Sequence, residues 1–324
     1  MARVHGLRYH LLVTKPEDGG ETVDLDTFIV AVYCLVDDLM EELLGDERLR
    51  SRGPNTVLDD REVITIEVVG EFLGLDTDTG IFGFFRRHYG EWFPALTEVH
   101  RTTFVRQAAN LWKVKGLLWR RLLWRIEHDE KVSLVDSFAV PVSGFAKAPR
   151  HRSFAGVASH GYDAMSKAVF YGFEGHLRVA WPGVIVEATL APADEHDRWV
   201  AEYDLLGAPD GVEEGSFVVG DTNYHSPILK EALAGYGVAL LAPVRTNKKR
   251  EVHPWPRWLT NVRRRIETVI SQMVERYGAK RVRARDLWHL TSRWLRKILG
   301  HTLCVCLCQR AGLPPLRFSE LVAL

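Results

Sequence analysis

The hydrophobic pattern of this chain changes near residue 128, and that change limits the folds that the chain can adopt. Before this point, apolar residues recur every three or four positions, which is the spacing of amphipathic helices. After it come short runs rich in Val and Phe, separated by Gly, Pro and Asp, which are typical of strands. The pattern predicts a helical N-terminal region followed by a mixed α/β region.

The individual elements follow from the same patterns. Helices are predicted at 27–44, 61–75, 77–93 and 104–126, with Asp24 or Asp26 as the N-cap of the first. Strands are predicted at 131–142, 167–181, 183–191, 216–221 and 237–244. Further helices are predicted at 194–206, 226–237, 263–278 and 286–308. Hairpin-like strands followed by strand–helix alternation indicate an α/β fold, a mixed sheet with helices packed on it.

Length and composition indicate a globular protein with a sizeable core. The chain has 324 residues, of which 46% are apolar and 26% charged, and this favours two domains of ordinary size. Its longest clean apolar run, from Thr27 to Val36, is too short to cross a bilayer, and the N-terminus lacks the apolar core of a signal peptide. We expect a cytoplasmic protein with no membrane partner.

Charge is balanced over the whole chain but segregated along it. Residues 1–50 contain 5 basic and 11 acidic residues, whereas residues 245–297 contain 16 basic and 4 acidic ones. A basic region of this density predicts a polyanion site, and a solvated charged face is the alternative.

Three carboxylates stand at positions where a lone charge is costly or sits among cations. Asp136 in SLVDSF and Asp221 in VVGDTNY lie at or near the ends of predicted core strands, where burial penalises an unpaired carboxylate. Glu267 follows Arg263 by one turn on a later predicted helix. Such a set can hold two Mg²⁺ ions, because hard cations prefer oxygen ligands. Taken singly, the aspartates could instead begin turns and Glu267 could form a surface ion pair.

The chain also contains the strings LVDSFAVPV, RHRSFAGVASHGYDAMSKAVFYGFEGHL, VVGDTNY, LLAPVRTNKK, RRRIETVISQM and KILGHTL. Together these strings resemble the DDE transposases of bacterial insertion sequences, and most closely the branch called insertion sequence family 982. The resemblance runs from about Val132 to Leu303 and weakens in the helical N-terminal region.

This resemblance implies a domain organisation. It implies a ribonuclease H-like catalytic domain at 129–310, with a mixed sheet flanked by helices and a basic insertion near 245–262. An α-helical DNA-binding and assembly domain would precede it at 1–128, and a C-terminal tail would follow at 311–324.

The resemblance also implies the site. Asp136, Asp221 and Glu267 would be the catalytic and metal-binding triad for two Mg²⁺ ions, for which Mn²⁺ can substitute. Related cut-and-paste enzymes carry a lysine after the closing glutamate, and here that position holds Val274, while Thr260 stands where they carry a tyrosine. The role of the lysine beside the scissile phosphate would pass to Arg276 or Lys280.

DNA contacts are predicted where cations and aromatic rings flank the predicted strands and the glutamate helix. For the two tryptophans in HPWPRW, base stacking and partial core burial are equally open. The predicted DNA-contacting residues are Arg150, Arg152, Lys167, Arg245, Asn247, Lys248, Lys249, Trp255, Trp258, Arg263 and Arg264.

Other residues that invite a functional reading have plainer explanations. The pair His196 and Asp197 resembles part of a metal-dependent phosphohydrolase site, but it lacks partners in sequence, so we expect capping and packing. His301 is expected to be a buried histidine. The cysteines, of which three lie at 304, 306 and 308, match neither a zinc site nor a redox pair and are expected to be small buried hydrophobes.

These expectations lead to one functional hypothesis. The chain would be a DNA transposase that cleaves at the ends of an insertion sequence and joins the 3′-hydroxyl ends to target DNA. Its partners would be the terminal inverted repeats, the target DNA and a second copy of itself or a larger multimer, at the nucleoid. The alternatives are a catalytically silent or co-opted DNA-binding protein and a ribonuclease H-like nuclease without strand transfer.

Overall fold

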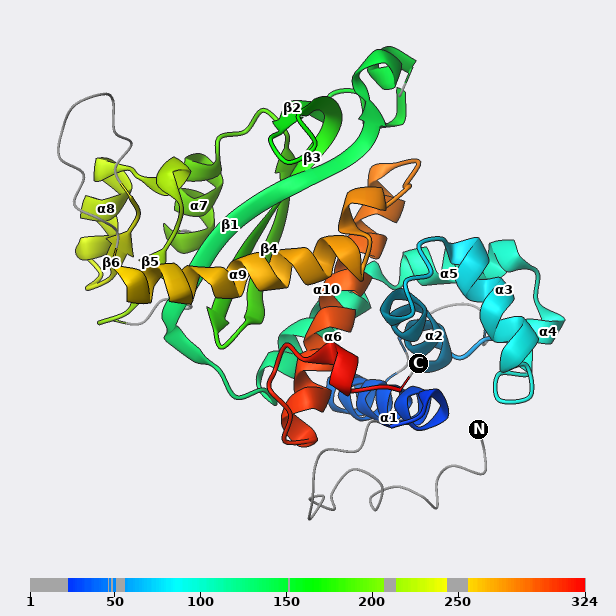
Figure 1. The fold of residues 1–324 in the computed structure, drawn as a ribbon. Coiled ribbons are helices and arrows are strands. Elements are labelled where there is room, and N and C mark those ends of the chain that lie inside the picture. The colour runs from blue at the N-terminus through cyan, green and yellow to red at the C-terminus, as the bar shows by residue number, and fades with distance from the viewer. Residues whose placement is uncertain are drawn as a thin grey trace. The chain divides into compact units, whose positions relative to one another are not determined.

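The computed structural model describes residues 23–45, 47, 49–50, 56–150, 152–206, 214–243 and 256–323. The chain divides into two compact units. One comprises residues 1–127 and 273–324, and its described part is helical; the other comprises residues 128–272 and is α/β (Figure 1).

The helical unit is built from amphipathic helices whose apolar faces meet in one core. Asp24 caps the first of them, as predicted, because its carboxylate accepts a hydrogen bond from the Thr27 N–H at 2.8 Å. The predicted helix at 104–126 is wrong as a single element: the structure breaks it at the buried Leu111. The Leu111 N–H is shared between the carbonyls of Gln107 and Ala108, which tightens the turn there. The helices are α1 (Leu25–Leu44), α2 (Asp60–Phe72), α3 (Asp78–His88), α4 (Ala95–Glu98), α5 (Arg101–Asn110), α6 (Trp112–Leu123) and α10 (Leu287–Arg310).

The central helix of this unit, α10, packs against α2, α5 and α6. Its C-terminal half is buried on all sides, and Cys304, Cys306 and Cys308 lie within it, so the prediction that this trio is buried is confirmed. His301 is also fully buried, with the Phe318 ring 5.1 Å away, and burial lowers its pKa to about 3.

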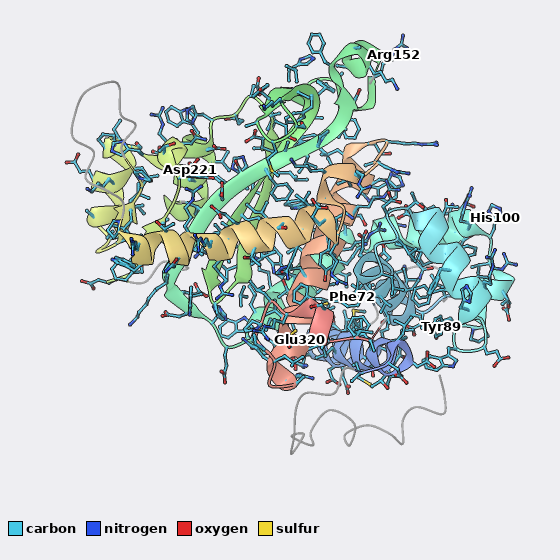
Figure 2. All side chains as sticks on the ribbon, viewed as in Figure 1. Phe72, Tyr89, His100, Arg152, Asp221 and Glu320 are labelled. Carbon is cyan, nitrogen blue, oxygen red and sulfur yellow. The ribbon has the colours of Figure 1, made fainter. Side chains whose placement is uncertain are left out.

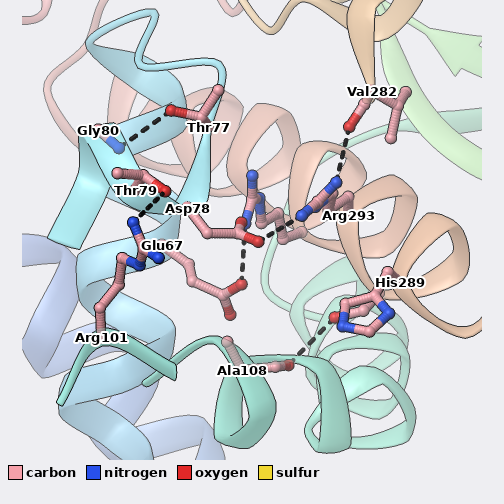
Figure 3. A network of polar contacts seen from close by, with 12 residues as sticks. Glu67, Thr77, Asp78, Thr79, Gly80, Arg101, Ala108, Val282, His289 and Arg293 are labelled. Atoms are coloured by element: carbon pink, nitrogen blue, oxygen red, sulfur yellow. Dashed lines mark hydrogen bonds and ion pairs between the residues drawn. The ribbon is translucent and has the colours of Figure 1, made fainter. Parts of the chain in front are cut away.

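Charged side chains from α2, α3, α6 and α10 form a buried network in the same unit. The Arg296 guanidinium donates to Glu71, Asp78 and Glu67, at 2.5, 2.6 and 3.1 Å. Lys115 donates to Glu67 at 2.7 Å, and Figure 3 shows Arg293 reaching Asp78 and the Val282 carbonyl. Each of these cations binds a carboxylate on another helix. The network therefore joins α10 to the N-terminal helices.

The α/β unit contains a six-stranded mixed sheet. Strand β1 pairs antiparallel with β3 and parallel with β5, and β6 extends the sheet parallel to β5. Both β2 and β4 pair antiparallel with β3. The predicted α/β class with a mixed sheet is thereby confirmed. The strands are β1 (Asp129–Gly144), β2 (Ser159–Asp163), β3 (Ala168–Trp181), β4 (Val184–Pro192), β5 (Phe217–Val219) and β6 (Ala239–Leu241).

Three helices accompany the sheet: α7 (Asp197–Leu206), α8 (Pro227–Ala234) and α9 (Arg257–Glu275). Val135 of β1 packs in one apolar cluster with Ala201 of α7 and Leu229 of α8, so these helices cover the face to which Val135 points. Helix α9 runs across the sheet (Figure 1), and the Arg265 guanidinium lies 5.1 Å from the centre of the Trp181 ring at the end of β3. Helices therefore flank the sheet as expected for this fold class.

The contact-based units and the predicted functional domains have different boundaries. Residues 273–324, which include α10, belong with the N-terminal helices, whereas the sequence places the end of the catalytic domain at residue 310. The division into a DNA-binding domain, a catalytic domain and a tail stays a proposal. No helix in the described part of the chain is both long and apolar enough to cross a bilayer.

Candidate active site

Asp136 was expected at or near a strand end, but it lies in the middle of β1, opposite Leu177 of β3, because the strand continues to Gly144 in its ladder with β3. Successive strand residues point to opposite faces, so Asp136 points away from the face that Val135 shares with α7 and α8. Burial raises the pKa of Asp136 to about 7; the hydrogen bond that its carboxylate accepts from the Ser137 N–H opposes this rise, and the nearby charge of Asp221 adds to it. The positive charge of Arg263, on α9, lowers the pKa of Asp136.

Asp221 follows β5 at the level of Asp136. In the parallel pair of β1 and β5, Leu134 lies opposite Val219, and each aspartate comes two residues later. The carboxylate of Asp221 caps the short 3₁₀ helix Thr222–Tyr224 by accepting a hydrogen bond from the Asn223 N–H at 2.7 Å. The register of the two strands thus brings both carboxylates to the same level of the sheet.

Gly220 is required by the packing of the turn. A Cβ atom at this position would lie 2.8 Å from the Cβ of Tyr224, which is buried. The Gly220 N–H also donates to the Leu241 carbonyl of β6 at 3.1 Å, which continues the ladder as far as Asp221. The GDTNY sequence therefore fixes its aspartate from both sides.

Glu267 lies on α9, and 54% of its side chain is exposed. One oxygen is 3.8 Å from the guanidinium of Arg263, one turn earlier, and the same Arg263 influences Asp136. Asp136 and Asp221 are thus brought together by the strand register, while convergence of Glu267 on them stays a prediction.

A second set of possible ligands escaped sequence reasoning. Glu174 and His176 of β3 and Asp197, the first residue of α7, offer ligand atoms that all lie within 4.8 Å of one another. Burial and the charge of Asp197 raise the pKa of Glu174 to about 7, and burial lowers the pKa of His176 to about 4. Spacing by two residues on a predicted strand was the available signal, since it puts Glu174 and His176 on one face. The pairing of that face with α7 has no local signal.

His196, the neighbour considered beside Asp197, has the capping role expected of it. Its Nδ1 accepts a hydrogen bond from the Arg198 N–H at 3.3 Å at the start of α7. Asp197 itself turns toward the sheet and accepts hydrogen bonds from Ser137 and Asn223.

The predicted DNA-contacting residues are only partly described. Figure 2 shows Arg152 on the segment that follows β1; it is exposed, as are Lys167, Arg264 and Trp258, and the Trp258 side chain is 57% exposed. Arg263 is half-buried. The side chain of Arg150 and the residues Arg245, Asn247, Lys248, Lys249 and Trp255 lie outside the described residues.

Two further cations bear on the lysine that the family pattern lacks. The Arg276 guanidinium lies 4.6 Å from the centre of the Phe72 ring and donates to the Phe72 carbonyl at 3.2 Å, within the helical unit. Lys280 lies in a short 3₁₀ helix of the same unit. Arg296 and Lys297, which end the basic tract, are buried against carboxylates and contribute nothing to a DNA-facing surface.

Comparison with known proteins relates the chain to a family of transposase domains and to a solved transposase structure. Residues 127–286 match the family model described as "Transposase DDE domain", and the match includes Asp136, Asp221 and Glu267. Among solved structures, the chain is similar to "Cryo-EM structure of piggyBac transposase synaptic complex with hairpin DNA (SNHP)", with a TM-score of 0.41 and 11% identity. That similarity covers 94% of this chain and 86% of the other. No curated protein matches the sequence.

Proposed function

We propose that the chain, whose residues 127–286 match a transposase DDE domain, is a DNA transposase that cleaves phosphodiester bonds at the ends of an insertion sequence. It then joins the freed 3′-hydroxyl ends to target DNA. The element belongs to the bacterial type that insertion sequence family 982 represents. The enzyme works as a homodimer or higher multimer, because two element ends must be processed together.

The observation that carries the proposal is the placement of Asp136 and Asp221 at the same level of neighbouring parallel strands. The pKa of Asp136 is raised by burial and by Asp221, so the metal-free pair resists full ionisation. A bound divalent cation removes that cost, and a carboxylate pair on neighbouring strands has the hard oxygen ligands that Mg²⁺ prefers.

In this proposal Asp136, Asp221 and Glu267 are the residues that would hold the metal ions. Two Mg²⁺ ions, or Mn²⁺ in their place, would supply the Lewis acidity that activates the attacking oxygen and stabilises the leaving one. Water is the nucleophile in cleavage and the 3′-hydroxyl in strand transfer.

Cations and an aromatic ring on α9 would bind the DNA. Arg263 and Arg264 lie on the same helix as Glu267. Phosphates bound by these arginines would therefore lie near Glu267. The exposed ring of Trp258 would stack on an unpaired base. The N-terminal helices would bind or pair the element ends.

The test compares wild type with Asp221→Asn on a labelled end substrate in Mg²⁺, at matched DNA occupancy. The DNA that flanks the gene supplies the end sequence. We expect cleavage and strand transfer both to fall by several orders of magnitude while DNA affinity is retained, because one set of ligands serves both steps. Asp194→Asn, which changes an exposed aspartate of the same unit, is the matched control.

Three other outcomes would contradict the proposal in different ways. Equal rates for wild type and Asp221→Asn would remove Asp221 from the site. DNA binding without cleavage by wild type would identify a silent or co-opted DNA-binding protein. Cleavage without joined products would identify a nuclease of the same fold.

A further inference from the structure

A second cluster of ligand-type side chains lies on the other face of the sheet from Asp136. Ser137 pairs with His176 in the ladder between β1 and β3, and Glu174 precedes His176 by two residues, so all three point to the face covered by α7. Asp197 enters the same space from the first turn of α7. We call Glu174, His176 and Asp197 the rear cluster.

His176 is the member that points to a ligand. It is 4% exposed, and neither ring nitrogen has a hydrogen-bond partner. Its Nδ1 lies 3.8 Å from Asp197 Oδ1, beyond hydrogen-bond distance. A buried imidazole with both nitrogens unsatisfied is costly, and it is rare in native proteins unless an ion or water is bound there.

The carboxylates of the cluster are oriented by neutral donors. Ser137 Oγ donates to Asp197 Oδ1 at 2.9 Å and lies 3.3 Å from Glu174 Oε2. The Asn223 amide donates to Asp197 Oδ2 at 3.1 Å. Within the described ranges, no Lys or Arg forms an ion pair with Glu174 or Asp197. Hydrogen bonds of this kind commonly orient the ligands of a metal site, and they leave the negative charge of the ligands unneutralised.

We propose that Glu174, His176 and Asp197 bind one divalent transition-metal ion, preferentially Zn²⁺. This site is separate from that of Asp136 and Asp221. One imidazole and two carboxylates suit Zn²⁺, whereas Mg²⁺ prefers oxygen ligands alone. The ligand atoms, all within 4.8 Å of one another, are close enough to share an ion. Water completes the coordination.

The ion would act structurally. It would fasten the start of α7 to β3 and, through the bond from Asn223 to Asp197, steady the turn that carries Asp221. The inference rests on the rear cluster alone and does not depend on the proposed transposase activity.

The test uses the full chain stripped of metal by a chelator and then dialysed into excess Mg²⁺. Zn²⁺ is added and its binding followed by calorimetry, with Co²⁺ as a spectroscopic probe of the same site. We expect one Zn²⁺ per chain and a rise of several degrees in Tm, because an ion that binds only the folded state stabilises it. His176→Gln and Asp197→Asn should each weaken Zn²⁺ binding roughly a hundredfold, since both remove a ligand.

Two controls separate the rear cluster from other sites. His160→Gln, which removes an exposed histidine of β2, and Asp136→Asn should both leave Zn²⁺ affinity unchanged. The circular dichroism spectrum of metal-free His176→Gln must match that of metal-free wild type, which shows that the variant folds. If it does not match, Zn²⁺ binding by Asp197→Asn is the test of the site. The proposal is overturned if wild type binds no Zn²⁺ in excess Mg²⁺, if both ligand variants bind it normally, or if Asp136→Asn abolishes binding.

Discussion

Asn223 donates a hydrogen bond from its side-chain amide to Asp197 Oδ2 at 3.1 Å. The backbone N–H of the same residue donates to Asp221 Oδ1 at 2.7 Å. One turn residue therefore holds a carboxylate from each of two elements, the start of α7 and the end of β5. Asn223 therefore links the start of α7 to Asp221 through two hydrogen bonds.

Asn223→Ala tests that connection. The variant keeps the backbone bond to Asp221 but loses the bond to Asp197, so we expect end cleavage to fall by about tenfold, as is usual when a residue that orients a ligand is removed. DNA affinity should be unchanged, and the unfolding free energy should fall by about 1 kcal/mol for the lost hydrogen bond. Thr268→Ala, an exposed change on α9, is the control, and equal cleavage by Asn223→Ala and wild type would refute the connection.

The position of Asp221 after a strand could be predicted because its signal is local, whereas Asp136 lies in the middle of β1 and not at a strand end. A short apolar run, a glycine and a carboxylate follow one another in SFVVGD, and the same run sets the register with β1. The N-cap of α1 at Asp24 was likewise readable, since capping involves residues three apart. Cys304, Cys306 and Cys308 could be placed in the core because free cysteine is usually buried.

Features that depend on distant contacts could not be predicted. Arg296 was counted in a basic tract, yet its carboxylate partners Glu71 and Asp78 lie more than 200 residues earlier in the chain. For the same reason the packing of α10 with the N-terminal helices could not be predicted. The rear cluster needs α7 to meet β3, and nothing in the sequence near Asp197 or His176 specifies that meeting.

Without metal, the buried negative charge of Asp136 should destabilise the folded state. Its folded-state pKa of about 7 is above the unfolded value of 3.8, so the folded state binds more protons between these values and stability falls as pH rises through this window. Metal-free Asp136→Asn lacks that penalty. At pH 8 it should be more stable than metal-free wild type by a few kcal/mol, and the difference should shrink toward pH 4.

Urea unfolding at both pH values, with and without Mg²⁺, measures this effect. Added Mg²⁺ should stabilise wild type but not Asp136→Asn, because only the carboxylate can hold the ion. Identical pH dependence for the two metal-free proteins would show that Asp136 is not buried as a charge.

Exposed cations of α9 should carry part of the DNA affinity. Arg257 and Arg264 are both exposed on this helix, so their joint replacement by alanine should weaken binding to all DNA sequences alike. The slope of log affinity against log salt should flatten by roughly 0.9 for each lost phosphate contact. Lys230→Ala, a change of an exposed residue on α8, is the control and should leave the slope unchanged. An unchanged slope in the double variant would show that these arginines only cover a solvated face.

The buried network of the helical unit should be sensitive to the loss of one cation. Arg296→Met leaves Glu71 and Asp78 buried with less compensation, and breaking a buried pair in this way costs about 3–5 kcal/mol. Arg317→Met is the matched control, because the Arg317 side chain is 62% exposed and its pair with Glu320 should contribute about 1 kcal/mol or less. Denaturant midpoints of the two variants give the comparison, and similar losses would mean that the buried network is not tightly coupled.

Gly220→Ala should damage the site through packing rather than chemistry. The new methyl group would lie 2.8 Å from the Cβ of Tyr224, and Tyr224 is only 2% exposed, in a core shared with Val135, Val218 and Leu229. The turn must therefore shift, which costs about 1–3 kcal/mol of unfolding free energy as in other overpacked cores. Because Asp221 is the next residue, the shift should also lower end cleavage in Mg²⁺ more than it lowers DNA binding.

Gly144→Ala separates crowding from a general effect of replacing glycine. A Cβ at Gly144 meets nothing within 4 Å, and this residue ends β1 in the same unit, so the control should change stability by less than about 0.5 kcal/mol. If Gly220→Ala is as stable and as active as Gly144→Ala, then Tyr224 yields to the new methyl group and the position of Asp221 is set by the strand alone. A loss of cleavage with full stability would instead mean that the methyl group obstructs the DNA directly.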